Sequence, residues 1–241
     1  MNAKPALSDE NRRLLVSGAH LLGVSLDKRA VEAFDRIFAE LTKWNRKMNL
    51  TALCDERSVV VRHFLDSLAP ARYLPPGASV LDIGPGAGFP GIPLKIARPD
   101  LGIVLLEATR KKTYFHKHLI RTLDLAGIRS VWGRSDAEQV RTDLRGDFDA
   151  VISRAALPLG LFLQEAVYFL RAEGMIVAMR GREPGIPIRP ESLGLTLCRT
   201  VLLNPPFDLM SRKLLFFRKT GTSKSHIQGR VPKDRPDGCP P

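Results

Sequence analysis

The sequence predicts an α/β fold, with a mostly parallel sheet, helices on both faces and a helical extension before it. Three observations lead to this prediction. From residue 78 onward, short apolar runs bounded by turn residues alternate with helical patterns, which is typical of a parallel sheet. Residues 1–70 show only the three- to four-residue apolar spacing of helices. A glycine-rich segment follows the first apolar run, where such folds bind ligands.

The composition is that of a globular chain. The 241 residues are 44% hydrophobic and 26% charged, which suits one large domain or one domain with an extension. The cysteines Cys54, Cys198 and Cys239 lack metal-ligand spacing, so we expect no metal site and no disulfide framework. No apolar run reaches the roughly 18 residues of a membrane span. Charged residues within the first 20 positions also argue against a secretory signal. We therefore expect a cytoplasmic protein that does not bind membranes.

The net charge of +12 favours a polyanionic partner such as nucleic acid, with a solubilising charge as the alternative. Half of it lies in residues 211–241, where eight Lys or Arg and two Asp leave +6. Residues 221–241 are also rich in Gly, Pro and Ser, so we predict a basic tail without fixed structure. A tail without any function is the alternative.

The N-terminal part is predicted to be helical over residues 10–22, 27–48 and 56–69. The second helix carries an apolar stripe from Val31 to Met48, and Asp27 can cap its first turn. A Leu-Pro-Pro-Gly turn follows at residues 74–77. We predict that residues 1–76 form a helical extension packed on the core, and that residues 77–220 form the ligand-binding domain.

The second part alternates between strands and helices. Buried strands are predicted at residues 79–83, 103–107, 130–132, 148–152 and 175–179. Helices are predicted between most of these strands, at residues 91–98, 110–126 and 158–171. Residues 195–204 and 213–219 can add further strands to the sheet.

The glycine-rich segment after the first strand predicts a cofactor site. Gly84, Gly86 and Gly88 lack Cβ, so the backbone can turn with positive φ and approach a ligand closely. Residues 86–91 match G-x-G-x-x-G, but Phe89 and Pro90 would crowd a pyrophosphate there, and a lone match is weak. The spacing instead favours a nucleoside cofactor without phosphates.

Glu107 ends the second predicted strand, where its carboxylate can accept hydrogen bonds from two ribose hydroxyls. This position suits NAD as well as S-adenosylmethionine, so Glu107 alone does not distinguish them. A surface acid at a strand end is the alternative.

Several segments together resemble one family. They are Trp44-Asn45 with Asn49-Leu50-Thr51, RHFLDS from Arg62, DIGPGAGFPGIPL from Asp82, EATRKK from Glu107, and Ser153-Arg154-Ala155. In their order and spacing, over about residues 40–182, they resemble the RsmG (GidB) family of small-subunit rRNA methyltransferases. The resemblance implies a class I methyltransferase (Rossmann-like) fold with a helical N-terminal extension. It also implies methyl transfer from S-adenosylmethionine to N7 of the guanine at position 527 of 16S rRNA.

The resemblance further implies the cofactor-binding residues. The methionine part should lie along the glycine segment, and the ribose and adenine beside Glu107. Ser135-Asp136 stands where the family has Ala-Glu, and aspartate has the shorter reach. The expected set is Asp82, Gly84, Gly86, Gly88, Phe89, Glu107, Ala108, Thr109, Ser135, Asp136 and Arg154.

Guanine N7 carries a lone pair and no proton, so methyl transfer needs no base, and the sequence identifies no certain catalytic residue. Arg154, Arg180 and His63 are candidates for positioning the reactants. Arg180 replaces the family's usual lysine and is expected to contact a phosphate or a base edge. For His63, a structural link between extension and sheet is the favoured interpretation.

Basic residues are expected to bind RNA. Arg110, Lys111 and Lys112 open a predicted helix, where positive charge is unfavourable unless an anion such as phosphate compensates it. A solvated charged turn is the alternative. The expected RNA-binding residues are Arg110, Lys111, Lys112, Arg180, Lys224, Arg230, Lys233 and Arg235. The expected partner is 16S rRNA in the small ribosomal subunit or its precursor, and the protein is expected to be a monomer.

Three other functions stay open on the sequence. A class I methyltransferase acting on a small molecule or protein would not need the basic surface. An NAD-dependent oxidoreductase is disfavoured by Phe89-Pro90 and by the lack of a convincing hydride-site His or Tyr. A non-enzymatic RNA-binding protein that kept the fold is disfavoured by the intact glycine segment with Glu107.

Overall fold

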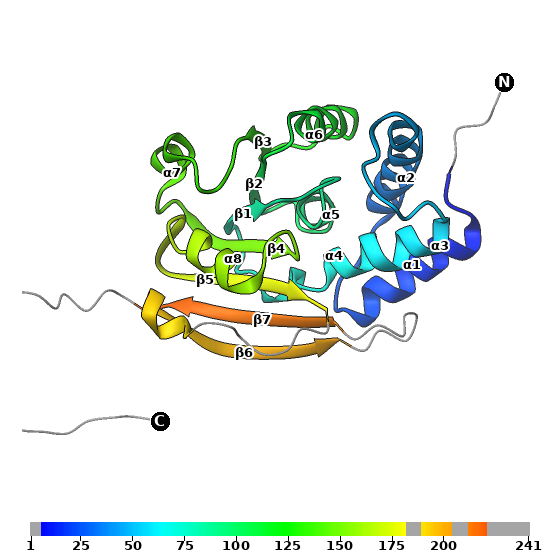
Figure 1. Cartoon of the computed structure of the whole chain (residues 1–241). Coiled ribbons are helices and arrows are strands. Elements are labelled where there is room, and N and C mark those ends of the chain that lie inside the picture. Colours follow the sequence, from blue (N-terminus) through cyan, green and yellow to red (C-terminus); the bar gives the residue numbers. More distant parts are fainter. Residues whose placement is uncertain (1–5, 182–188, 204–211, 221–241) are drawn as a thin grey trace, which may run out of the picture.

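The computed structural model describes residues 6–181, 189–203 and 212–220, and its centre is a seven-stranded sheet (Figure 1). The strand order is β3-β2-β1-β4-β5-β7-β6. The first five strands run parallel, whereas β7 is antiparallel to both of its neighbours. The strands are β1 Ser79–Ile83, β2 Gly102–Glu107, β3 Ile128–Trp132, β4 Phe148–Arg154, β5 Leu170–Arg180, β6 Leu195–Leu203 and β7 Arg212–Lys219. The predicted, mostly parallel α/β sheet is confirmed.

Helices cover both faces of the sheet (Figure 1). One apolar core joins the N-terminal helices, α5 and α6 to one face, and a second core joins α7 and α8 to the other. Between α3 and α4 the helix widens into a π-helical segment, η1. The helices are α1 Asp9–Leu21, α2 Lys28–Met48, α3 Glu56–Val59, η1 Val60–Leu65, α4 Asp66–Leu68, η2 Ala71–Tyr73, α5 Gly91–Ala97, α6 Arg110–Thr122, α7 Glu138–Leu144, α8 Leu159–Ala166 and η3 Pro190–Leu193.

The N-terminal helices are part of the main core. Phe34 of α2 packs on Phe64 of η1 with ring centroids 4.9 Å apart, and both side chains are fully buried. The same apolar cluster contains Val80 of β1 and Ile103 of β2. Extension and sheet therefore share one buried interface, and removing the extension would expose part of this core to water.

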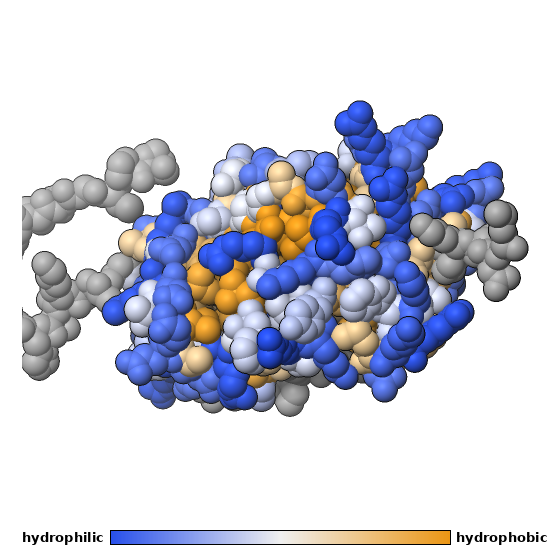
Figure 2. Space-filling view, turned by 90° about the horizontal axis from the view of Figure 1, so that it is seen from above, coloured by the Kyte–Doolittle hydropathy of each residue, from blue (hydrophilic) through white to orange (hydrophobic). Residues whose placement is uncertain are grey.

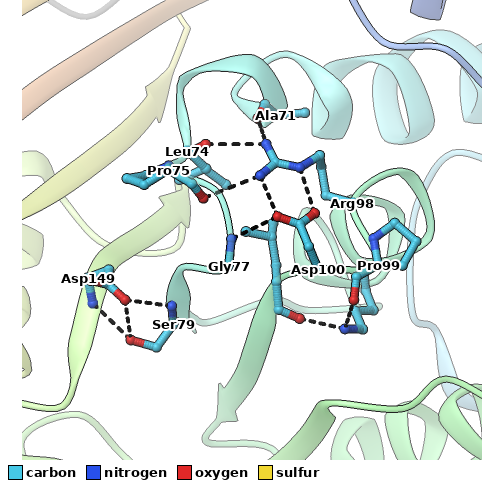
Figure 3. A network of polar contacts seen from close by, with 11 residues as sticks. Ala71, Leu74, Pro75, Gly77, Ser79, Arg98, Pro99, Asp100 and Asp149 are labelled. Carbon is cyan, nitrogen blue, oxygen red and sulfur yellow. Dashed lines mark hydrogen bonds and ion pairs between the residues drawn. The ribbon is translucent and has the colours of Figure 1, made fainter.

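Polar contacts also tie the extension to the sheet at the amino ends of the strands (Figure 3). The Arg98 guanidinium donates to the carbonyls of Ala71 (2.7 Å) and Leu74 (3.2 Å). It also pairs with Asp100 at 2.7 Å, and Asp100 accepts from the Gly77 amide at 2.8 Å. Arg98 thus satisfies the carbonyls of the connection between extension and β1, and it lies at the edge opposite the candidate site.

The prediction and the structure differ at three helices. The helix α7 was not predicted, because it buries only Val140 and Leu144. The helix expected over 158–171 ends at Ala166, and β5 begins already at Leu170, which pairs with Phe148. The helix expected over 110–126 ends earlier, at Thr122.

In the described part of the chain, no helix is both long and apolar enough to cross a membrane. The same residues contain no group of three His, Cys, Asp or Glu arranged to hold a metal ion.

Candidate active site

The glycine segment turns sharply at the carboxyl end of β1. Gly84, Gly86 and Gly88 have φ values of +69°, +61° and +97°. A Cβ on Gly84 would lie 2.5 Å from Cβ of Ala156, and one on Gly88 would lie 2.5 Å from Cδ1 of Ile92. The positive φ values therefore favour glycine at all three positions, and close packing against Ala156 also requires it at Gly84.

A buried histidine that was not predicted from the sequence supports this segment. His116 of α6 donates from Nε2 to the Gly86 carbonyl at 2.8 Å, and its Nδ1 lies 3.0 Å from Ser130 Oγ. Burial lowers the pKa of His116, so the ring stays neutral and Nδ1 accepts from the serine. A single histidine on an apolar helix face does not indicate from the sequence that it supports a glycine-rich turn.

Asp82 lies at the end of β1 beneath the same segment. It is fully buried, and its Oδ2 accepts from the Gly91 amide at 2.8 Å, which fixes the start of α5. Its Oδ1 is buried and has no hydrogen-bond partner among the described residues. Burial raises the pKa of Asp82 to about 7. The site therefore contains an acceptor that a donor from a ligand can satisfy.

A pocket of about 340 Å³ opens beside the glycine segment, at the carboxyl ends of β1 to β4. Glu107 is nearly buried at its wall, where Oε2 accepts from the Gly86 amide (3.1 Å) and Oε1 from the Thr109 amide (2.8 Å). A carboxylate has about four acceptor positions, so Glu107 can still accept from two hydroxyls. We call this space, a candidate cofactor site, the cofactor pocket.

Six of the expected cofactor-binding residues line this pocket: Gly84, Gly86, Glu107, Ala108, Ser135 and Asp136. Four other expected residues do not line the pocket: Asp82, Gly88, Phe89 and Thr109. Two of them contact residues next to it, because Asp82 accepts from the Gly91 amide and the Thr109 amide donates to Glu107. Three further lining residues were not predicted from the sequence, because they come from the segment after β4 and from α8: Leu157, Leu161 and Glu165.

Asp136 is engaged by a neighbouring cation. Both of its oxygens accept from Arg134, at 2.9 Å each, and this contact lowers the pKa of Asp136. The group is an ionised acceptor at the pocket rim. Because the pair is exposed, Asp136 can exchange Arg134 for another donor at little cost.

A second pocket, of about 430 Å³, lies on the other side of the end of β4. Ala155 lines it, whereas the next residue, Ala156, lines the cofactor pocket. Its walls come from η1, α4 and the adjoining ends of β4, β5 and β7. The charged or titratable residues that line it are Arg62, His63, Asp66, Arg154, Arg180, Arg212 and Lys213. We call it the arginine pocket.

Arg154 lines the arginine pocket rather than the cofactor pocket. Its guanidinium donates to the Arg62 carbonyl at 2.7 Å and lies 3.5 Å from Asp66 Oδ2. It also lies 5.4 Å from the centre of the Phe89 ring. Arg154 thus connects the extension, β4 and the glycine segment.

His63 orients Arg154. Its Nδ1 accepts from Arg154 Nη2 at 3.1 Å, so Nε2 carries the proton and donates to Thr51 Oγ1 at 2.8 Å. The ring stacks on Phe89 with centroids 4.6 Å apart. Burial and the Arg154 charge lower the pKa of His63 to about 3. A neutral ring with both nitrogens engaged is a link in the structure and not a proton carrier.

Arg180 lies between the two pockets. Its side chain is only 3% exposed, and Nη1 donates to the Leu157 carbonyl at 2.6 Å. Leu157 lines the cofactor pocket, whereas Arg180 lines the arginine pocket. This burial favours a role in holding the segment after β4 over the expected direct contact with a phosphate.

Of the other expected RNA-binding residues, Arg110 and Lys111 are exposed at the start of α6. Arg110 lies 5.3 Å from the Trp132 ring centre and 5.9 Å from that of Tyr114, and both rings are more than half exposed. Lys112 lines the cofactor pocket. Figure 2 looks down on the side that carries α6 and α7, where hydrophobic residues gather among hydrophilic ones. Lys224, Arg230, Lys233 and Arg235 lie outside the described residues.

The sheet order, the glycine segment and the acidic residue at the end of β2 define a class I, S-adenosylmethionine-dependent methyltransferase. A solved structure of this class, a SAM-dependent methyltransferase from Aquifex aeolicus, aligns with a TM-score of 0.54 and 15% identity. The alignment covers 71% of this chain and 97% of that one.

Residues 30–211 match the model of the GidB family, rRNA small subunit methyltransferase G. A protein of that name from Geobacter metallireducens is 38% identical over 222 residues, covering 90% of this chain and all of the relative. Another, from Caldanaerobacter subterraneus subsp. tengcongensis, is 42% identical over 179 residues, or 73% of this chain and 75% of the relative. The chain belongs to the GidB family.

Proposed function

We propose that this chain transfers a methyl group from S-adenosylmethionine to N7 of the guanine at position 527 of 16S rRNA. The observation that carries the proposal is membership of the GidB family over most of the chain. The chain is accordingly an S-adenosylmethionine-dependent methyltransferase of small-subunit rRNA. The basic composition favours this substrate over a small molecule.

The residues around the cofactor pocket fit the cofactor. The glycine segment is a cradle that any Cβ at Gly84 would narrow. Asp82 Oδ1 is a buried acceptor without a protein partner among the described residues, suited to the cofactor's ammonium group, and Glu107 has acceptor capacity for the ribose hydroxyls. When bound, S-adenosylmethionine supplies an electrophilic methyl group.

The arginine pocket is the proposed place for the target guanine. It adjoins the cofactor pocket across Ala155 and Ala156, so a base held there faces the donor. N7 attacks through its lone pair, and His63 is needed only to orient Arg154. Holding two reactants in line can supply up to about 7–11 kcal/mol of the barrier reduction.

The basic face around α6 supports binding of the surrounding rRNA. Arg110 and Lys111 are exposed beside Tyr114 and Trp132, whose rings offer stacking surfaces for unpaired bases. The basic tail is proposed to add phosphate contacts. We propose a monomer that acts in the cytoplasm on the small ribosomal subunit or its precursor.

The test measures transfer of a labelled methyl group from S-adenosylmethionine to small-subunit rRNA from ribosomes that lack their own 7-methylguanosine. Free 16S rRNA and intact small subunits are offered in parallel, and binding of S-adenosylhomocysteine is measured separately. We expect incorporation of one methyl group per rRNA molecule. No incorporation into either form, with cofactor binding intact, would overturn the proposal.

A further inference from the structure

The arginine pocket contains a carboxylate that methyl transfer itself does not require. Asp66, the first residue of α4, lies between two guanidinium groups: Oδ1 is 3.3 Å from Arg212 Nε, and Oδ2 is 3.5 Å from Arg154 Nη1. Its side chain is 10% exposed and lines the pocket. The two cations come from β4 and β7, so the fold brings together three charged groups that are distant in sequence.

The two arginines hold this carboxylate in place without using all of its hydrogen-bond acceptor positions. Charge-assisted N–H···O contacts are usually about 2.7–2.9 Å long, and both of these ion pairs are longer. Burial raises the pKa of Asp66, and the two guanidinium groups oppose that effect. In its ionised form, flanked by two permanent cations, Asp66 only accepts hydrogen bonds. It can therefore accept from a further donor inside the pocket.

Guanine offers such donors in an order that matches the pocket. N1–H and the N2 amino group lie side by side on one edge, O6 comes next, and N7 follows on the far side of O6. Arg154 interacts electrostatically with both Asp66 and Asp82, so it lies between the arginine pocket and the base of the glycine segment. A base held by Asp66 at N1 and N2 would present O6 to Arg154 and N7 to the methyl donor.

We propose that Asp66 selects guanine by accepting hydrogen bonds from N1–H and the N2 amino group of the target base. The inference rests on the proposed function and adds the residue that determines base specificity. Adenine is rejected because its N1 is an acceptor and would face the carboxylate. The competing interpretation is that Asp66 only positions Arg154 and Arg212 for phosphate binding.

The test compares guanosine with inosine at the target position of reconstituted small subunits. Inosine keeps N7, O6 and N1–H but lacks the N2 amino group, so only one of the proposed contacts is lost. We expect the wild-type enzyme to methylate inosine about 10- to 100-fold more slowly in kcat/KM, as for a lost hydrogen bond to a charged group. Asp66→Asn should lower that preference at least about threefold, because a neutral amide oxygen accepts a weaker hydrogen bond than a carboxylate does, whereas Asp66→Glu should retain much of it.

The matched control is Asp124→Asn, an exposed aspartate between α6 and β3 at the opposite edge of the sheet, which should keep the full preference. Equal slowing of both substrates in Asp66→Asn would overturn the inference in favour of the positioning role. A wild-type enzyme indifferent to inosine would also overturn it, and that measurement needs no substituted protein. No methylation of guanosine subunits by the wild type would instead overturn the proposed function, and this inference with it.

Discussion

At the scale of single residues, the site depends on polar groups whose partners fix their charge. Glu107 accepts from two backbone amides and faces the cofactor pocket. His63 is held neutral between Arg154 and Thr51. Substitutions at these two residues should have different effects. In the proposed function Glu107 contacts the cofactor, whereas His63 acts through Arg154.

Glu107→Gln should weaken binding of S-adenosylhomocysteine about 10- to 100-fold. The substitution removes the charge that the ribose hydroxyls contact, and a hydrogen bond to a charged group contributes about 1.5–3 kcal/mol. Isothermal titration calorimetry measures the effect. The control is Glu138→Gln, an exposed residue at the start of α7, which should bind as the wild type does. Unchanged affinity in Glu107→Gln would refute the assignment.

His63→Gln should reduce the loss of stability on acidification. The pKa of His63 is about 3 in the folded protein against 6.5 as a model value. Between these values the unfolded state binds more protons, so the histidine's contribution to stability is lost as pH falls from about 6.5 toward 3. A fully transmitted shift of this size corresponds to about 5 kcal/mol.

Urea unfolding of wild type and variant between pH 7.5 and 4.5 measures this difference. Asp82 contributes with the opposite sign, because its pKa is raised to about 7, and this contribution cancels when variant and wild type are compared. His20→Gln on the exposed side of α1 is the control. Identical pH slopes in wild type and His63→Gln would contradict the account.

At the scale of elements, the extension is joined to the sheet through a shared core and through Arg98 (Figure 3). The guanidinium satisfies carbonyls in the connection to β1 and pairs with Asp100. This connection lies at the amino edge of the sheet, whereas both pockets lie at the carboxyl edge. Stability and cofactor binding should therefore respond separately to changes here.

Arg98→Ala should lower the free energy of unfolding by about 2–3 kcal/mol, since it leaves partly buried carbonyls and Asp100 without their donor. The affinity for S-adenosylhomocysteine should stay within about twofold of wild type. Arg29→Ala, an exposed residue of α2, controls for loss of a surface cation. A large loss of cofactor affinity in folded Arg98→Ala would show that the two edges are coupled.

Helices and strands with a clear pattern of apolar residues could be predicted from the sequence. The apolar runs that became β1, β2 and β4 and the stripe of α2 were predicted nearly to their ends. Helix α7 was not predicted, because most of its residues face solvent. Of the site, the glycine segment and Glu107 were predictable from local spacing. The contact of Asp66 with Arg212 was not, because the two residues are far apart in the sequence and meet only where the folded chain brings α4 next to β7.

At the scale of the whole molecule, the two pockets face one edge of the sheet, and basic residues surround them. Substrate binding to such a surface releases counterions, so it weakens with added salt. Arg110 and Lys111 begin α6, next to the cofactor pocket. Their contribution should therefore appear in the salt dependence of RNA binding rather than in cofactor affinity.

The double substitution Arg110→Gln and Lys111→Gln should make the plot of log Kd against log salt shallower by about 0.7–0.9 for each cation removed. Filter binding of 16S rRNA at several salt concentrations measures the slope. Arg13→Gln on the exposed side of α1 should leave it unchanged. An unaltered slope in the double variant would place the rRNA on another face.

Chemical mapping of the product shows whether the methyl group is transferred to N7 of one guanine. After reaction with unmodified small subunits, borohydride reduction and aniline cleave the rRNA at 7-methylguanosine. We expect one new cleavage, at position 527, that depends on S-adenosylmethionine and is lost in Glu107→Gln at limiting cofactor. Incorporation of label without cleavage at that guanine would contradict the proposed function, because the methyl group would then lie on another atom or another nucleotide.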